Sequence, residues 1–127
     1  MWGAGSMDMS IEEFENKVME VLQGLPQKFK DKFENIEFII DEDSSSPLLY
    51  KRPARPHYTL GLYHGVPLTS KTSRGQQFPD RIIIYKKSIE AVSSDRKSLE
   101  KNIKRVVLHE IGHYFGISES RLKELGY

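Results

Sequence analysis

The chain contains no cysteine, and this absence removes several kinds of chemistry at once. Without cysteine there are no disulfide bonds, no zinc site with thiolate ligands and no thiol nucleophile. A metal site must therefore use carboxylates and the four histidines, which are His57, His64, His109 and His113. The absence of disulfides also suits a reducing compartment, so we expect a cytoplasmic protein.

Long apolar runs are missing as well, and the mean hydropathy is −0.53. We therefore expect no segment that spans a membrane. The first ten residues, MWGAGSMDMS, lack the basic and apolar regions of a secretory signal. We interpret residues 1–6 as an artificial extension ahead of a natural start at Met7. A length of 127 residues then predicts one domain over residues 7–127.

The net charge of +1 conceals two halves of opposite charge. Residues 1–50 carry 11 acidic and 4 basic side chains, whereas residues 51–127 carry 7 acidic and 15 basic ones. A basic half can attract nucleic acid. Here the basic residues are spread over several predicted elements and no nucleic-acid-binding motif accompanies them. We expect the two halves to pack together and compensate each other, and we predict no nucleic-acid partner.

Hydrophobic spacing predicts a helix near the start of the chain, followed by strands. Ser10 is a suitable N-cap for this helix, Glu13 completes a capping box, and Pro26 follows its end. Three strands are predicted from their β-branched and aromatic content, at residues 36–41, 58–63 and 81–87.

A longer helix is predicted near the C-terminus. It begins after Ser94 or Asp95 and ends at Gly116, and a short helix capped by Ser118 closes the chain. Its apolar stripe consists of Leu99, Ile103, Val106, Val107 and Ile111. The order of helix, strands and helix predicts an α+β fold.

This longer helix contains HEIGH at residues 109–113, the His-Glu-x-x-His pattern of many zinc peptidases. In a helix, His109 and His113 lie about 40° and one turn apart, so both imidazoles can bind one ion at ~2.0–2.1 Å. Glu110 lies beside the first histidine, where it can take a proton from a water that the ion makes acidic. The pattern arises by chance about once in a hundred chains of this composition. An ordinary helix with two histidines is therefore the competing interpretation.

A third ligand is expected close behind the pair, because only 14 residues follow His113. Gly116 permits the left-handed turn that ends a helix, after which Glu119 can return toward the ion. The resulting spacing is that of metzincins, with a carboxylate in place of the last histidine and with no Met-turn. Glu124 is the second choice of ligand. The alternative role for Glu119 is that of a helix N-terminal carboxylate.

Three blocks of the chain, LGLYHGVPLT, PDRIIIYKKSIE and VVLHEIGHYFGISESRLKELGY, resemble the small bacterial zincin-like metallopeptidases, also called minimal or matrix-metalloprotease-like zincins. The resemblance covers most of residues 11–127. It implies a small twisted mixed sheet, a backing N-terminal helix and an active-site helix near the C-terminus. It also implies His109 and His113 as zinc ligands, Glu110 as the catalytic carboxylate and Glu119 as the acidic third ligand.

Zincins bind an extended substrate along the edge strand above the active-site helix. The predicted rim is YTLGLYHGVPL at residues 58–68, with Gly61, Tyr63, His64 and Gly65 as candidate substrate-binding residues. The glycines would let a substrate backbone approach closely. Alternatively they serve a bulge and a turn, and His64 is a solvated loop residue.

The sequence therefore predicts a zinc-dependent peptidase with Glu110 as general base and a peptide or protein as substrate. The alternative is a zincin-fold binding module with weak or no catalysis, because so small a fold offers little surface for binding a substrate. No feature of the sequence predicts an oligomeric state.

Overall fold

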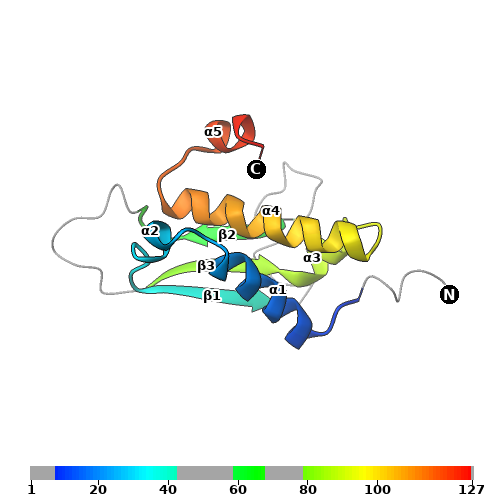
Figure 1. The fold of residues 1–127 in the computed structure, drawn as a ribbon. Coiled ribbons are helices and arrows are strands. Elements are labelled where there is room, and N and C mark those ends of the chain that lie inside the picture. Colours follow the sequence, from blue (N-terminus) through cyan, green and yellow to red (C-terminus); the bar gives the residue numbers. More distant parts are fainter. Residues whose placement is uncertain (1–7, 43–58, 68–78, 127) are drawn as a thin grey trace.

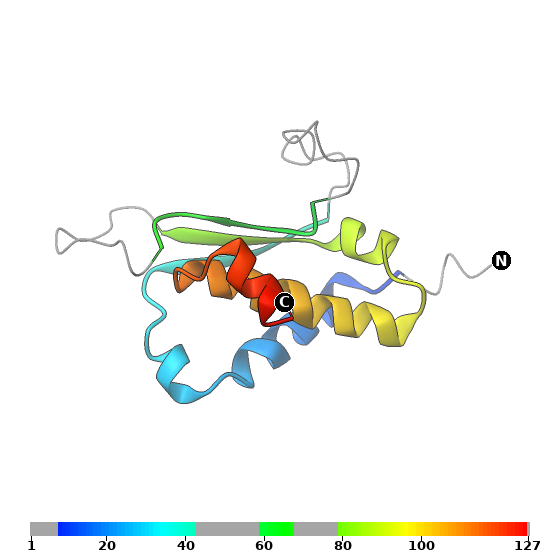
Figure 2. The ribbon, with the colours of Figure 1, turned by 90° about the horizontal axis from the view of Figure 1, so that it is seen from above.

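The computed structural model describes residues 8–42, 59–67 and 79–126. Three strands form one sheet, and the helices α1 and α4 lie on the same side of it (Figures 1 and 2). None of the helices in these ranges is long and apolar enough to cross a membrane. In chain order the elements are α1 Ile11–Gln23, α2 Gln27–Lys30, β1 Ile36–Asp41, β2 Gly61–His64, β3 Asp80–Tyr85, α3 Lys86–Ala91, α4 Arg96–Tyr114 and α5 Glu119–Glu124.

The sheet has the strand order β1-β3-β2. The central strand β3 is parallel to β1 and antiparallel to β2, which confirms the predicted mixed sheet and α+β fold. Ile82 and Ile84 of β3 are fully buried in the core with Ile103 and Val107 of α4. All five apolar residues predicted for the stripe of α4 are buried, so the core lies between the sheet and the helices.

The N-terminal helix begins at the predicted cap. The Ser10 hydroxyl accepts a hydrogen bond from the Glu13 backbone N–H at 3.1 Å, and Phe14 and Val18 face the core. The Glu13 carboxylate forms an ion pair with Arg96 at the start of α4. Glu13 thus helps to cap α1 through its backbone N–H, and its carboxylate ties α1 to the start of α4.

Two predicted strands have different limits in the structure. The strand predicted at residues 58–63 is β2, Gly61–His64, and the predicted start at Tyr58 lies outside the described residues. The strand predicted at residues 81–87 is β3, which ends at Tyr85 because Lys86 begins α3. Helical spacing from Lys86 places Glu90 one turn on, where the two charged groups pair at 2.9 Å in the interior.

Asp95, not Ser94, caps the helix that carries the HEIGH motif. The Asp95 carboxylate accepts a hydrogen bond from the Ser98 backbone N–H at 2.7 Å, and the Ser98 hydroxyl accepts one from the Asp95 N–H at 3.0 Å. This reciprocal capping box satisfies two backbone donors at the start of α4. The helix then runs for 19 residues and brings HEIGH to its C-terminal end.

Candidate metal centre

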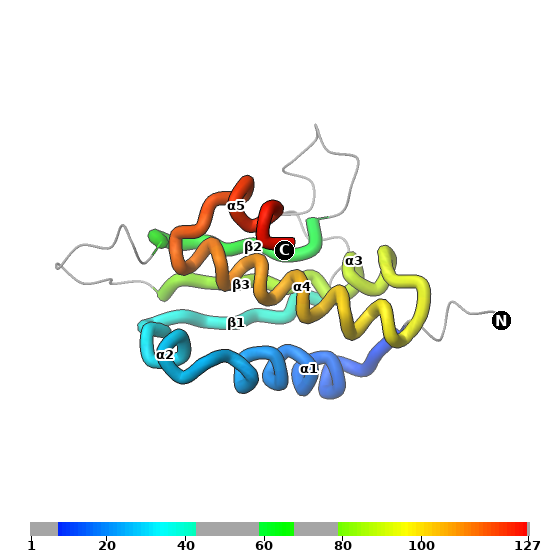
Figure 3. Tube along the Cα trace, turned by 45° about the horizontal axis from the view of Figure 1, so that its top comes forward, coloured from blue at the N-terminus to red at the C-terminus, as the bar shows by residue number. Residues whose placement is uncertain are grey.

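Gly116 ends α4 in a turn that reverses the chain. Its φ of +87° is in the left-handed region, which glycine adopts without a steric penalty. The Gly116 N–H donates to the His113 carbonyl and the Ile117 N–H to the Gly112 carbonyl, both at 2.9 Å. This pair of bonds is a Schellman motif. Ser118 then caps α5, which runs back along α4 from its C-terminal end toward its middle (Figures 1 and 3).

The close packing of α5 against α4 depends on Gly112, which lies inside the HEIGH motif. A Cβ atom at this position would lie 2.5 Å from Cδ2 of Leu122, which is itself 2% exposed. Leu122 therefore fills the space that a larger side chain at residue 112 would occupy. Neither residue has a role predicted from the sequence, although a glycine within a helix is a recognised sign of close packing.

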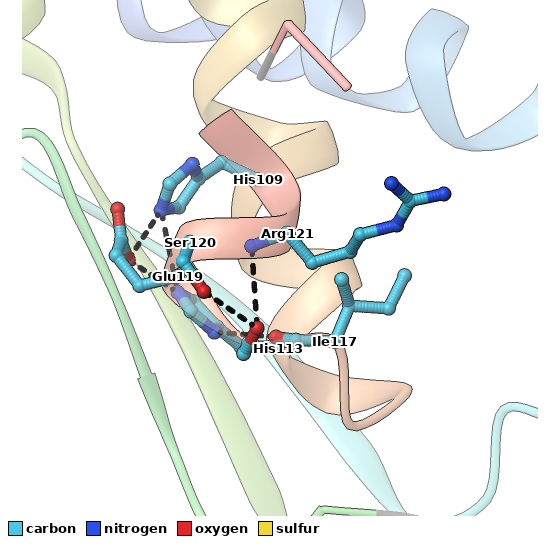
Figure 4. Close-up of polar contacts among 7 residues, drawn as sticks. His109, His113, Ile117, Glu119, Ser120 and Arg121 are labelled. Atoms are coloured by element: carbon cyan, nitrogen blue, oxygen red, sulfur yellow. Dashed lines mark hydrogen bonds and ion pairs between the residues drawn. The ribbon is translucent and has the colours of Figure 1, made fainter. Parts of the chain in front are cut away.

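The turn brings three potential ligand atoms together (Figure 4). Oε1 of Glu119 lies 3.1 Å from Nε2 of His109 and 3.0 Å from Nε2 of His113, and the two Nε2 atoms are 3.3 Å apart. Atoms bound at ~2.0–2.1 Å to a tetrahedral ion lie roughly 3.3–3.4 Å from one another. The three atoms are thus spaced nearly as one face of such a tetrahedron.

The hydrogen bond at Nδ1 of His113 determines whether its Nε2 can act as a metal ligand. Nδ1 of His113 lies 3.2 Å from the carbonyl oxygen of Ile117, to which it can only donate. In the neutral ring, Nε2 then carries a lone pair, yet it faces a carboxylate oxygen of Glu119 at 3.0 Å. Two acceptors this close require a positive charge between them, either a proton or a metal ion. The donor set and its spacing therefore fit a metal ion.

The charge of Glu119 also suits a cation. Partial burial acts to raise its pKa, but the hydrogen bonds and charges of His109 and His113 outweigh burial and lower the pKa below its ordinary value. The carboxylate is therefore ionised at neutral pH. Glu124, the second predicted ligand, instead pairs with Arg121 at 2.9 Å. Figure 4 shows the Arg121 guanidinium pointing away from the two histidines.

Glu110 lies beside this group of ligand atoms but is not a member of it. Its side chain is buried, and the residue is 7% exposed. Burial raises the pKa of its carboxyl group, while the charges of His109 and His113 and a hydrogen bond from the Tyr63 backbone N–H act in the opposite direction. Strand β2 thus holds a carboxylate of raised pKa next to the histidine pair.

Gly61 allows β2 to approach α4 this closely. A Cβ atom on Gly61 would lie 2.8 Å from Cγ1 of Val106 and 3.1 Å from Cγ of Glu110. Side chains of α4 thus fill the space on the Cβ side of Gly61. At Gly65 the neighbour is a side chain of β3, because a Cβ atom there would lie 2.5 Å from Cγ of Asp80.

The Tyr63 side chain is likewise engaged inside the protein. Its hydroxyl donates to Oδ2 of Asp80 at 2.6 Å, and its ring packs edge-on against Tyr114. Burial, and then the hydrogen bond to Asp80, raise the Tyr63 pKa far above its ordinary value, so the hydroxyl stays a neutral donor. Tyr63 therefore positions Glu110 through its backbone and anchors β2 through its side chain.

A cleft of about 960 Å³ opens over the site. It is lined by β2 and the residues before it, by α4 and by α5, and includes His109, Glu110, His113 and Glu119. Of the predicted rim residues, Gly61, Tyr63 and Gly65 line this cleft. His64 is exposed at the end of β2 and is not among the lining residues.

Comparisons with known proteins agree with this arrangement. A family model described as zincin-like metallopeptidase matches residues 33–127, which confirms the resemblance seen in the sequence. No curated protein matches the chain. Among solved structures, a conserved hypothetical protein from Thermus thermophilus is similar, with 18% sequence identity and a TM-score of 0.55 over 84% of this chain and 94% of that chain. At this identity the likeness concerns the fold alone.

Proposed function

Because the chain belongs to the zincin-like metallopeptidase family, we propose that it is a zinc-dependent peptidase in which Glu110 is the general base. The observation that carries the proposal is the convergence of His109, His113 and Glu119 on one point, beside a buried carboxylate and inside a cleft. A cytoplasmic location is also proposed, and the absence of cysteine supports it.

The metal would be held by Nε2 of His109, Nε2 of His113 and Oε1 of Glu119. Three protein ligands leave a fourth position open, as catalytic zinc sites do. A divalent ion there would polarise a carbonyl oxygen and make water more acidic. Zinc is proposed because two imidazoles and one carboxylate form a common catalytic zinc set, although other first-row ions accept the same donors.

Glu110 would take a proton from water as it attacks the peptide carbonyl and deliver it to the leaving amine. A base works best when its pKa is near the working pH, and burial moves the Glu110 pKa in that direction. The hydrogen bond from the Tyr63 N–H fixes the carboxylate before a substrate arrives. Because the base is already oriented, its ordering adds no entropic cost to the reaction.

A peptide is proposed to lie along β2. This strand is the last in the order of the described sheet, and its residues line the cleft beside Glu110. An extended chain can add to such an edge through backbone hydrogen bonds. Gly61, Tyr63 and Gly65 line the same cleft and would form its wall, whereas His64 lies outside it.

The test combines metal content with hydrolysis. Untagged protein purified without added metal is analysed by mass spectrometry and incubated with a peptide library, beside Glu110→Gln. We expect about one zinc per chain in both proteins, cleavage by the parent, and cleavage reduced at least ~100-fold in the variant. Equal cleavage by both proteins would refute the role of Glu110. Peptide capture without cleavage by zinc-loaded parent would instead support the binding-module alternative.

A further inference from the structure

Two cations, Arg105 and Lys123, line the same cleft as the candidate metal centre. Arg105 precedes His109 by four residues on α4, and Lys123 follows Glu119 by four residues on α5. Residues four apart share one face of a helix. Each cation therefore stands on the face that carries a potential metal ligand, one turn away from it.

The direction of α5 places both cations at the same end of the cleft. The helix α5 runs back along α4 (Figures 1 and 3). Arg105 lies before His109 on α4, and Lys123 lies after Glu119 on α5, so both cations are displaced from the ligands in the same direction. Four residues of helix correspond to about 6 Å along the axis. The two positive charges thus stand on the neighbouring helices α4 and α5, displaced from the candidate metal centre in one direction.

Neither cation forms an ion pair with any residue in the described ranges. Arg105 contacts the neutral side-chain oxygen of Asn102 at 3.3 Å. The two carboxylates that line the cleft are otherwise engaged, Glu119 with the histidines and Glu110 with the Tyr63 N–H. The cleft therefore presents two positive charges that the described part of the chain does not neutralise.

We propose that Arg105 and Lys123 select peptides that carry a carboxylate near the scissile bond, on one side of it only. This inference rests on the proposed function, since it takes the cleft as the substrate site. An extended chain advances about 3.3 Å per residue, so ~6 Å places the carboxylate within about two residues of the bond. The carboxylate belongs either to an acidic side chain or to a free C-terminus, and Arg105 can bind it through two parallel hydrogen bonds.

The first experiment scans one charge along a cleaved peptide. A neutral, C-terminally amidated peptide is compared with versions that carry one glutamate at each of three positions on either side of the scissile bond, and with a truncated version ending in a free carboxylate. We expect kcat/KM to rise about tenfold for a carboxylate within two residues on one side. Arg105→Gln and Lys123→Gln should each remove about threefold of this preference at low salt, so that together they account for about tenfold. The controls Lys104→Gln and Arg121→Gln remove a charge from the same helices outside the cleft lining, and should leave the preference unchanged.

A binding measurement separates this inference from the proposed function. Fluorescence anisotropy follows a labelled glutamate-containing peptide and its glutamine counterpart on chelator-treated protein. We expect tighter binding of the acidic peptide to the parent but not to the Arg105→Gln/Lys123→Gln double variant. An acidic preference in binding that the double variant loses, without cleavage by zinc-loaded protein, would uphold carboxylate recognition by Arg105 and Lys123 and overturn the peptidase. Cleavage with no acidic preference would overturn the inference and leave the peptidase standing.

Discussion

Nε2 of His113 lies 3.0 Å from Oε1 of Glu119, although a helix end and a reversal of the chain separate the two residues. The contact exists because Gly116 takes a left-handed conformation and Ser118 then starts a new helix. An acceptor nitrogen and a carboxylate at this distance repel each other unless a cation lies between them. The short C-terminal segment thus extends a pair of histidines to a candidate three-ligand metal site.

Replacing Glu119 by alanine tests that site directly. The change removes one of three ligand atoms and the negative charge that partly balances the ion. Since altering groups that merely support a ligand weakens metal binding 10- to 100-fold, we expect a loss of at least ~100-fold in zinc affinity. Competition with a chromogenic chelator measures it. Glu124→Ala is the matched control, because Glu124 pairs with Arg121 on the same helix. Equal affinity of both variants would exclude Glu119 as a ligand.

Gly116→Ala should weaken the same site without touching a ligand. An alanine at φ +87° is strained by about 1–2 kcal/mol, and relief of that strain moves α5 and Glu119 away from the histidines. We expect a lower midpoint of urea unfolding together with weaker zinc binding. Gly126→Ala is a control, because Gly126 also has a positive φ of +92° but a Cβ there meets nothing within 4 Å. A destabilised Gly116→Ala that binds zinc as tightly as the parent would contradict the link between the turn and the site.

Local chemistry explains which features the sequence predicted. Ser10 and Ser118 cap helices through bonds that span only three residues, and the stripe of α4 follows from helical spacing. The position of Glu119 was predictable for the same reason, since Gly116 is only three residues before it. Each of these features depends on groups that are near neighbours in the chain.

Features that depend on distant packing were not predicted. The space at Gly61 is filled by α4 and that at Gly112 by Leu122, and neither partner is a sequence neighbour. The end of β3 was misplaced for another reason, because Lys86 follows the apolar run of residues 82–85 directly, with no glycine or proline between them to indicate a break. The four-residue spacing of Lys86 and Glu90 was the available sign of a helix there.

Gly61→Ala should disturb Glu110 through its neighbour. The new methyl group would meet Cγ1 of Val106 at 2.8 Å and push β2 away from α4, which lengthens the bond from the Tyr63 N–H to Glu110. Overpacking of this kind costs about 1–3 kcal/mol of unfolding free energy. We expect kcat to fall with little change in zinc content. The double variant Gly61→Ala/Val106→Ala removes the closest contact and should regain part of kcat; no recovery would place the defect elsewhere.

Protonation of Glu110 should be visible in the stability of metal-free protein. Burial raises its pKa in the folded state, so the ionised carboxylate destabilises the fold above that pKa, while the protonated form does not. Glu110→Gln should therefore melt at a higher temperature than the parent at pH 7.5 in chelator. As the pH falls toward the ordinary glutamate value of about 4.3, the difference should vanish, because both side chains are then neutral. A difference that persists unchanged at pH 4 would show that ionisation is not its source.

The buried pair of Lys86 and Glu90 offers a test of the fold that leaves the metal centre intact. The two residues are 3% and 5% exposed, and the Glu90 oxygen that pairs with Lys86 also accepts the Met9 N–H at 2.8 Å. Lys86→Met leaves a buried carboxylate without its countercharge, so we expect a loss of about 3–5 kcal/mol in urea unfolding at pH 7. Lys86→Met/Glu90→Gln removes the charge but keeps an acceptor for Met9, and should recover most of that loss. If the double variant were as unstable as the single one, the ion pair would matter for its packing rather than its charge.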